Sequence, residues 1–515
     1  MGAFSQTFSF LALLFALWVG FNVYKVFKVP PIPEVQLDKY WGHGQPGKTA
    51  DTSIRTFTVE FKQEMVKDLK DRLVRTRPFT KPLEGVGFQY GFNSDYLSEV
   101  IDFWRTKYDF TERQKYLNMY PQFVTNIQGL DMHFLHIKPK NPNQLKVVPL
   151  ILLHGWPGSF VEFHKTIPYF VRPREGKDFV FEVVVPSLPG YGYSQGASKT
   201  GLGELEIAIV MRNLMKRLNY KRFVIQGGDW GSVIGSHMAT VFPDQVIGYH
   251  SNFAIAITAS SNLKFLVGSI FPSLVLDREF EQNIFPLGKM FDKLVEESGY
   301  LHIQSTKPDT IGAALLDSPA GLAAYILEKF CIWTNPKFKS LRDGGIQKKF
   351  TLTELIDNLM VYWDSRSIVT SARLYAESDT IKTMGRGLIS IPTEVPTAIA
   401  RFEHEMLMFT EGQYRSKYPN LLQLSDFPDG GHFAALEHPE ALSNDLWSAT
   451  QKFLEFHRKK NAKIELNPVP VIYIILGRQI IPQLGSYIMG LFKTNVHSFL
   501  FSKRSSAQHP RCHRP

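Results

Sequence analysis

One short segment places a carboxylate where many hydrolases carry a nucleophilic serine. Residues 223–232 read FVIQGGDWGS, so an apolar strand runs into a turn of small-x-acid-x-small pattern and then into a helix. Such a turn is strained and presents its central side chain, here Asp229, above the carboxyl edge of a sheet. The N-terminus of the following helix favours an ionised carboxylate there. An aspartate that only caps this helix is the alternative interpretation.

A second segment, late in the chain, supplies a candidate base. His432 follows two glycines and precedes the last predicted helix. One histidine among 15 carries little weight by itself, but the expected order in this architecture is nucleophile, acid, histidine. Glu403 and Glu405 both qualify as the orienting acid, since a two-residue period puts them on one face of a late strand. Spacing alone does not separate them.

A third segment, HGWPG at residues 154–158, follows a predicted strand directly. Its loop can aim the amide of Trp156 at the turn that carries Asp229, and the Trp230 amide can join it as an oxyanion hole. Removing one such donor typically costs about 3–4 kcal/mol of barrier. A simple Gly/Pro turn is the alternative, and His154 is predicted to be structural.

The choice of Asp over Ser indicates the kind of reaction. A carboxylate that attacks an sp³ carbon forms an alkyl ester, which water can cleave, whereas serine would leave a stable ether. The segment therefore suits an epoxide or an alkyl halide as the electrophile. His432 would deprotonate the water, and its carboxylate partner would hold the correct tautomer.

The surrounding pattern predicts an α/β sheet that positions these residues. Apolar strands and helices alternate from residue 147 onward, which is typical of a parallel sheet covered on both faces. A mostly helical insertion over residues 253–395 is expected to lie over the sheet. The predicted strands are 147–153, 179–185, 223–226, 396–403 and 421–424, and the predicted helices are 203–218, 232–242 and 439–459.

Composition is that of a folded protein, with 44% hydrophobic and 21% charged residues among 515. The net charge of +10 is spread along the chain and gives no nucleic-acid patch. The cysteines, Cys331 and Cys512, do not make a disulfide framework and favour a reducing compartment. His404-Glu405 lacks the second histidine of a zinc helix because position 408 is Met, so no metal and no cofactor are predicted.

The N-terminus predicts a membrane anchor. Residues 8–24 are almost wholly apolar, lack a positive charge before them, and are followed by Lys25, Lys28 and a proline-rich stretch. A cleaved signal peptide is the alternative, but no A-x-A site follows. Positive charge after the segment predicts a cytoplasmic body. At the other end, 469–492 is predicted to be an amphipathic or membrane-surface segment, with a second membrane span as the alternative, and 502–515 a basic tail.

Taken together, these motifs resemble the microsomal epoxide hydrolase family, which includes juvenile hormone epoxide hydrolases. The resemblance extends over roughly residues 1–460 and includes GGDWGS, HGWPGS and GGHF. It implies an α/β-hydrolase fold with a helical cap, an N-terminal family domain, no cofactor, and hydration of epoxides to vicinal diols. It also implies a single-pass protein of the endoplasmic reticulum membrane. The partners it implies are a small lipophilic epoxide and the membrane, with no nucleic acid and no obligate protein partner.

The resemblance also assigns residues that the spacing leaves open. The distance to Lys417-Tyr418-Pro419 selects Glu405 as the acid, and two cap segments supply Tyr300 and Tyr375 as proton donors to the epoxide oxygen. The expected divisions are an anchor (1–28), a linker (29–50), an N-terminal domain (51–146), a core in two parts (147–252 and 396–460), a cap (253–395) and a C-terminal extension (461–515).

Two other functions fit parts of the pattern. A haloalkane dehalogenase could use the same Asp, with Trp donors for the halide, although paired tyrosines argue against it. A membrane-tethered lipid-binding scaffold would need no turnover, although no member of the catalytic set is missing. Among epoxides, the residues do not separate foreign arene or alkene oxides, lipid epoxides and juvenile hormone.

Overall fold

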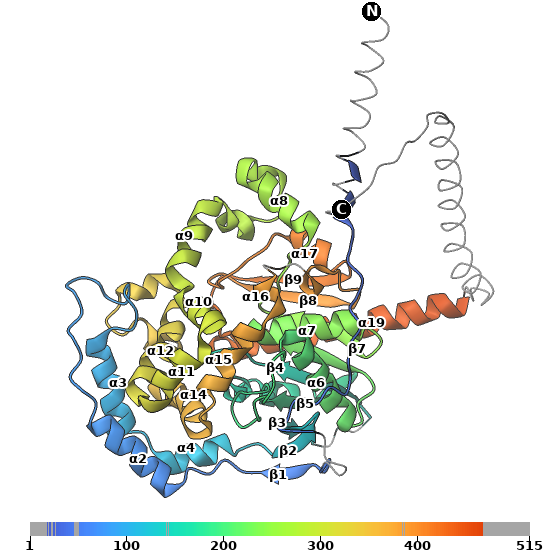
Figure 1. Ribbon diagram of the computed structural model, residues 1–515. Helices are drawn as coiled ribbons and strands as arrows, with labels where there is room; N and C mark the ends of the chain where they lie inside the picture. Colours follow the sequence, from blue (N-terminus) through green and yellow to red (C-terminus); the bar gives the residue numbers. More distant parts are fainter. Residues whose placement is uncertain are drawn as a thin grey trace, which may run out of the picture. The chain divides into compact units, whose positions relative to one another are not determined.

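The fold is described from a computed structural model, for residues 18–466 except 19, 22, 23, 26, 46–50, 141, 143, 384 and 386. In this part of the chain one nine-stranded sheet has the order β1-β2-β3-β5-β4-β6-β7-β8-β9 (Figure 1). The strands are β1 (Arg55–Phe57), β2 (Gln122–Ile127), β3 (Leu130–Ile137), β4 (Lys146–Leu153), β5 (Phe179–Pro186), β6 (Phe223–Gly227), β7 (Val246–Ser251), β8 (Thr397–Phe402) and β9 (Leu421–Phe427).

Six neighbouring strands of the sheet, β5, β4, β6, β7, β8 and β9, run parallel, as the alternating pattern predicts. Each predicted strand is confirmed to within a few residues. The antiparallel strands β1, β2 and β3 extend the sheet beyond β5, through pairing of β3 with β5. The carboxyl ends of the parallel strands therefore meet at one edge, where β4, β6 and β8 lead into the segments that carry the predicted site.

Helices cover both faces of the sheet. Gly235 of α7 (Asp229–Val241) faces Tyr249 of β7, whereas Phe453 of α19 (Pro439–Leu466) meets the neighbouring Gly248. Because successive strand residues point to opposite faces, α7 and α19 lie on opposite sides. Trp447, also of α19, stacks on Phe179 of β5. The helix predicted at 232–242 begins three residues earlier, at Asp229.

The segment between β7 and β8 is helical, as expected. Its helices are α8 (Ala259–Ile270), α9 (Leu287–Glu297), α10 (Gly299–Thr306), α11 (Pro308–Asp317), α12 (Pro319–Ile332), α13 (Ile346–Lys349), α14 (Leu352–Ser365), α15 (Ile368–Glu377) and α16 (Asp379–Lys382). The remaining helices are α2 (Gln63–Val74), α3 (Ser94–Thr106), α4 (Phe110–Leu117), α5 (Ile167–Phe170), α6 (Glu204–Arg217), α17 (Glu411–Lys417) and α18 (Ala434–Glu437).

The N-terminal helices support this helical cap. Helices α2 and α3 contact α12, and α3 also contacts α14. A buried polar link joins the two regions, in which Asp357 of α14 accepts hydrogen bonds from the Tyr108 hydroxyl at 2.8 Å and from Arg113 Nε at 2.9 Å. Burial raises the pKa of Asp357 to about 6, against the opposing effect of Arg113.

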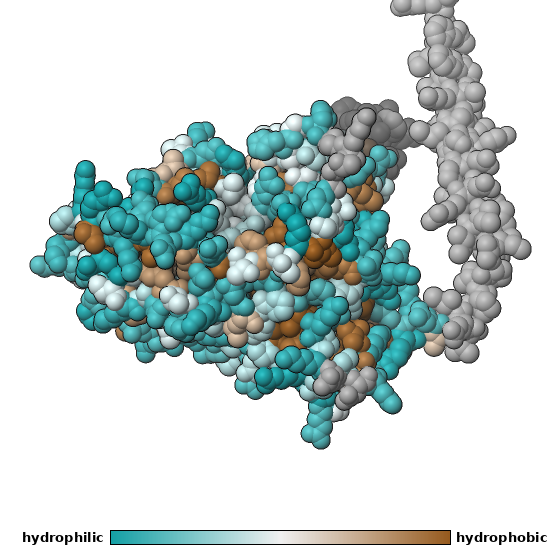
Figure 2. All heavy atoms as spheres, turned by 90° about the horizontal axis from the view of Figure 1, so that it is seen from below, coloured by the Kyte–Doolittle hydropathy of each residue, from teal (hydrophilic) through white to brown (hydrophobic). Residues whose placement is uncertain are grey.

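The apolar residues lie mainly inside. The buried core runs continuously from the N-terminal helices through the sheet into the cap. The face in Figure 2 is largely hydrophilic, with apolar side chains in small separate clusters. The high aromatic content thus serves packing, including the walls of the site described below.

The predicted membrane segments mostly fall outside the described residues. Of residues 8–24 only four are described, and residues 467–515 are not described. In the part of the chain that is described, no single helix has the length and hydrophobicity of a membrane span, and α11 with α12 meets both criteria only as a pair bent by 118°.

Close packing of α7 on β4 yields a first prediction. A Cβ atom on Gly231 would lie 2.0 Å from the carbonyl oxygen of Leu153, so Gly231→Ala must push the helix away from the sheet. We expect a loss of about 1–3 kcal/mol in the free energy of unfolding, measured with urea, because overpacking forces backbone shifts. Gly288→Ala in α9 is the matched control, since its Cβ would meet no atom within 4 Å. Equal stability of the two variants would contradict the packing argument.

Candidate active site

Asp229 lies on the strained turn that the sequence predicts. Its φ is +48°, in the left-handed region that non-glycine residues rarely adopt. Gly228 is the N-cap residue of α7, and no side chain caps the helix there. The Asp229 carboxylate instead accepts a hydrogen bond from the Trp156 amide, at 2.8 Å from Oδ1. The helix-capping interpretation of Asp229 is therefore wrong.

The loop after β4 approaches this carboxylate closely. A Cβ atom on Gly155 would lie 2.0 Å from Asp229 Oδ1, so only glycine leaves room for the carboxylate at this point. The neighbouring His154 has a structural place, as predicted, because its Nε2 accepts a hydrogen bond from the Leu188 amide at 3.1 Å. Burial lowers the pKa of His154 to about 4, so its ring is neutral.

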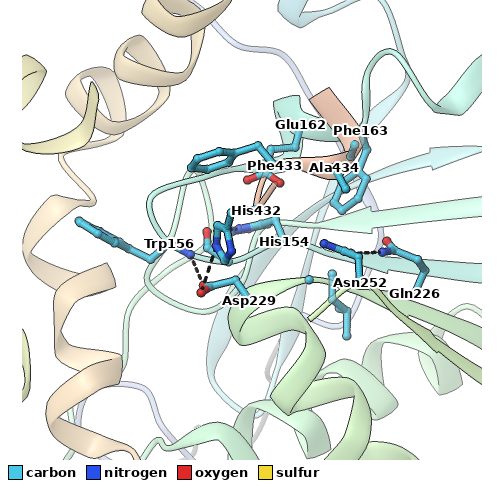
Figure 3. A pocket seen from close by; sticks show the side chains of 14 residues that line it. His154, Trp156, Glu162, Phe163, Gln226, Asp229, Asn252, His432, Phe433 and Ala434 are labelled. Atoms are coloured by element: carbon cyan, nitrogen blue, oxygen red, sulfur yellow. Dashed lines mark hydrogen bonds and ion pairs between the residues drawn. The ribbon is translucent and has the colours of Figure 1, made fainter. Parts of the chain in front are cut away.

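His432 lies between two carboxylates. Its Nδ1 is 2.8 Å from Glu405 Oε1, and its Nε2 is 3.4 Å from Asp229 Oδ2. The side chains of His432 and Glu405 are 3% and 2% exposed, while that of Asp229 is 14% exposed. Figure 3 shows the His432 imidazole and the Trp156 amide next to each other, both directed at the Asp229 carboxylate. The sequence-predicted Asp229, Glu405 and His432 are thus brought together.

The structure separates the two candidate acids, and it shows that the expected shared strand face is wrong. Strand β8 ends at Phe402, so Glu403 and Glu405 lie in the turn and loop that follow rather than on one strand face. Glu403 is exposed, whereas Glu405 is buried against His432. The Met406 amide donates to the same Glu405 oxygen at 2.6 Å and helps to fix it.

The backbone around His432 is held by residues that the sequence analysis missed. The His432 amide donates to the carbonyl oxygen of Trp333 at 2.9 Å. Glu437 accepts hydrogen bonds from the amides of Gly431 at 3.1 Å and Phe433 at 3.0 Å. Burial raises the pKa of Glu437 to about 7. An acid five residues after the histidine was the only signal that could have pointed to it.

Electrostatics favour the imidazolium form of His432. Burial alone would lower its pKa, but the charges and hydrogen bonds of Glu405 and Asp229 outweigh burial and raise the pKa well above its ordinary value of 6.5. In the resting site the three groups form a buried carboxylate–imidazolium–carboxylate arrangement.

A cavity of about 240 Å³ opens on the cap side of Asp229. Its walls are nearly all apolar and come from both the core and the cap. Tyr300 of α10 and Tyr375 of α15 line it, with ring centroids 5.9 Å apart. Trp156 stacks on Tyr300 at 5.1 Å, and Trp230 meets Tyr375 edge-on at 4.9 Å.

The two cap tyrosines are suited to donate protons or hydrogen bonds. Burial raises the pKa of both Tyr300 and Tyr375 well above the ordinary value of 10. Both phenols therefore keep their protons at neutral pH, beside the carboxylate of Asp229. The arrangement brings together one carboxylate, an imidazole with a second carboxylate, and two phenols beside an apolar cavity.

Comparison with known proteins decides the family. Residues 54–163 match the family described as epoxide hydrolase N terminus, and residues 148–439 match the alpha/beta hydrolase fold. Juvenile hormone epoxide hydrolase 2 of Ctenocephalides felis is 50% identical over 457 residues, which cover 88% of this chain and 98% of that protein. The chain belongs to the epoxide hydrolases. Epoxide hydrolase 1 of Oryctolagus cuniculus is 43% identical, with 85% and 97% covered.

Solved structures agree with the observed fold. The crystal structure of juvenile hormone epoxide hydrolase from the silkworm Bombyx mori is 47% identical and superposes with a TM-score of 0.80, covering 82% of this chain and all of that one. The Aspergillus niger epoxide hydrolase is 26% identical, with a TM-score of 0.63 and 81% and 99% covered. The α/β-hydrolase fold and the N-terminal domain implied by the resemblance are thereby confirmed.

The oxyanion contacts and the possibility of a metal site can also be compared with the sequence predictions for this epoxide hydrolase. The Trp156 amide contacts Asp229 as predicted, whereas a second oxyanion contact from the Trp230 amide stays a prediction. Among the described residues no group of three or more His, Cys, Asp or Glu side chains is arranged to hold a metal ion.

The raised pKa of His432 predicts a pH-dependent contribution to stability. A raised folded-state pKa contributes stability that is fully present below the unfolded value of 6.5 and is lost as pH rises through the folded value. The difference in unfolding free energy between the wild type and His432→Gln should therefore shrink with increasing pH, measured with urea from about pH 6 to about pH 10. His302→Gln, at an exposed position of α10, is the control. A difference that stays constant with pH would show that no imidazolium is stabilised.

Proposed function

We propose that this epoxide hydrolase is a membrane-bound enzyme that hydrates lipophilic epoxides through a covalent ester on Asp229. The observation that carries the proposal is the position of the Asp229 side chain. Asp229 lines the apolar cavity together with Tyr300 and Tyr375. Its carboxylate is held by the Trp156 amide and by His432.

The first half of the reaction is ring opening. Oδ1 accepts a hydrogen bond from the Trp156 amide at 2.8 Å, whereas Oδ2 has only the longer contact of 3.4 Å with His432 Nε2, so Oδ2 is the oxygen that attacks an epoxide carbon. The new C–O bond forms as the epoxide C–O bond breaks, and negative charge develops on the epoxide oxygen. Tyr300 or Tyr375 gives that oxygen a proton, so the product is a hydroxyalkyl ester. Donors placed where charge develops lower the barrier because they need no reorganisation.

The second half is hydrolysis of the ester. Alkylation removes the negative charge of Asp229 beside His432, which lowers the pKa of the imidazolium and lets its proton return to the tyrosinate. Neutral His432 then takes a proton from water, and the hydroxide attacks Cγ of Asp229. The tetrahedral oxyanion is stabilised by the amides of Trp156 and Trp230. Collapse of the intermediate breaks the Cγ–O bond to the diol, and the departing alkoxide takes the proton from His432. The carboxylic acid left on Asp229 then gives its proton to His432, which restores the carboxylate and the imidazolium.

The proposed substrates are lipophilic because the cavity walls are apolar and because residues 8–24 predict a membrane anchor. We place the protein in the endoplasmic reticulum membrane with its body on the cytoplasmic side. Among lipophilic epoxides, juvenile hormone is the substrate that we favour. Relatives named juvenile hormone epoxide hydrolase are 44–50% identical to this chain, whereas those named epoxide hydrolase 1 are 43% identical. Turnover of juvenile hormone, arene oxides and lipid epoxides side by side tests this choice.

Haloalkane dehalogenation is the second reaction that a nucleophilic Asp could support. A halide leaving group needs no proton, so two buried phenols beside Asp229 favour an epoxide. Halide release from a chloroalkane by the purified protein would revive the dehalogenase alternative. Ligand binding without turnover would instead favour a lipid-binding scaffold.

Isotope labelling tests the covalent route. In a single turnover in H₂¹⁸O, we expect the label in the Asp229 carboxylate and the first diol unlabelled, because hydroxide attacks the ester carbonyl. His432→Gln should accumulate the ester, with diol formation slowed at least about 100-fold, since it lacks the base. Mass spectrometry of the peptide containing Asp229 detects both the ¹⁸O label and the accumulated ester. Asp229→Ala should form no ester, and Asp244→Asn, at an exposed position, should behave as wild type. Label appearing directly in the first diol would sink the ester route.

Phenylalanine substitutions test the two donors. Tyr300→Phe and Tyr375→Phe should each slow ester formation by about 10- to 100-fold, and the double variant by more, because the epoxide oxygen loses its donors. Stopped-flow measurement of tryptophan fluorescence can follow this step, since Trp156 and Trp230 contact these rings. Tyr325→Phe is the control, because Tyr325 packs against Trp156 but does not line the cavity. An unchanged rate in the double variant would remove both tyrosines from the reaction.

A further inference from the structure

A second, much smaller cavity lies on the opposite wall of the site. Its volume is about 20 Å³, and three polar residues, His432, Glu162 and Gln226, are among those that line it (Figure 3). Asp229 is the one residue that lines both this cavity and the apolar one. The Asp229 carboxylate therefore separates an apolar space on the cap side from a polar space on the side of His432.

The small cavity fits a single water molecule. A space of at least about 10–15 Å³ with two or more polar partners is enough to hold one. One partner is plainly available, since Gln226 Oε1 is buried and has no hydrogen-bond partner among the described residues. The other end of this amide is occupied, because Gln226 Nε2 donates to Asn252 Oδ1 at 2.9 Å. An unsatisfied buried acceptor of this kind calls for a small donor in the cavity.

Glu162 reaches the cavity through a specific arrangement of the HGWPG loop. It lies on the short 3₁₀ helix Phe160–Phe163, four residues after Gly158. A Cβ atom on Gly158 would lie only 1.2 Å from Glu162 Oε1, so glycine at 158 is what leaves space for this carboxyl group. The loop that brings the Trp156 amide to Asp229 thus also places a carboxyl group beside the same site.

The state of this carboxyl group is set by its surroundings. Burial raises the pKa of Glu162 to about 8, with His432 opposing and Asp229 adding to the rise. At neutral pH the group is therefore mostly a neutral acid, and its carbonyl oxygen can accept a hydrogen bond. Since a neutral acid is a poor base, Glu162 does not compete with His432 for the proton of water.

We propose that Glu162 positions the hydrolytic water for attack on the ester of Asp229. This inference rests on the proposed covalent function and assigns a further residue to its second half. Before alkylation the water donates its hydrogens to Gln226 Oε1 and to Glu162. After alkylation, neutral His432 Nε2 replaces Gln226 as the second acceptor, and a lone pair of the water faces Cγ of Asp229. The O–H bond to His432 breaks as the new C–O bond forms.

Separate measurement of the two half-reactions tests this assignment. Glu162→Leu removes the acceptor and should slow ester decay by about 10- to 100-fold while ester formation keeps its wild-type rate, since only the water loses its orientation. Glu162→Gln keeps a carbonyl acceptor in the same place and should retain most of the decay rate. Rapid acid quench followed by mass spectrometry of the Asp229 peptide gives both rates. Glu206→Gln is the control, as another partly buried glutamate with a raised pKa that lies away from both cavities.

The possible outcomes distinguish failure of the role assigned to Glu162 from failure of the proposed ester route. Equal ester decay in the wild type and Glu162→Leu, or an equal loss in both half-reactions, would overturn the assignment while leaving the ester route intact. A decay in Glu162→Gln as slow as in the leucine variant would also overturn it, because the acceptor would then be irrelevant. No ester in the wild type would overturn the proposed function and this inference together. If Glu162→Leu does not fold, Glu162→Ala replaces it under the same criteria.

Discussion

The site depends on the Asp229 carboxylate being held by an amide at one oxygen and by a protonated imidazole at the other. The Trp156 amide fixes Asp229 Oδ1, and His432 approaches Oδ2. Both contacts are made with the backbone of Asp229 in the left-handed conformation. That strain is tolerated because the close contacts of Gly155 with Asp229 and of Gly231 with Leu153 lock the loop, the helix and the strand together.

How well each site residue could be predicted from sequence depends on how it is positioned in the fold. Asp229 and the loop at 154–158 follow buried strands directly, so local pattern and sheet geometry were sufficient to place them at one edge. Glu405 was different, because it lies in an irregular loop after β8, and a strand period does not apply there. The tyrosines were out of reach for pattern analysis, since cap helices place them by tertiary packing. They were identified only through resemblance to a family.

The position of the cap is therefore as important as the sheet, because two of the proposed donors come from it. Two buried polar links hold the cap in place. One joins Asp357 of α14 to Tyr108 and Arg113 of the N-terminal region. The other joins Glu281, in the 3₁₀ helix Glu279–Ile284, to Arg401 of β8 at 2.7 Å. Breaking a buried pair of this kind leaves an uncompensated charge, so these links oppose displacement of the cap. The N-terminal domain thus both extends the sheet and stabilises the cap.

The two cavities resolve a conflict that any lipophilic substrate creates. A pocket that binds an apolar epoxide must exclude water, yet the proposed ester is useful only if water reaches its carbonyl carbon. Placing Asp229 in the wall between an apolar cavity and a polar one lets each reactant approach from its own side. The water then need not be displaced when the substrate binds, so its hydrogen bond to Glu162 can fix part of its orientation before ring opening begins. Since orientation fixed in advance reduces the entropic part of a barrier, this division favours the hydrolytic half of the proposed reaction in particular.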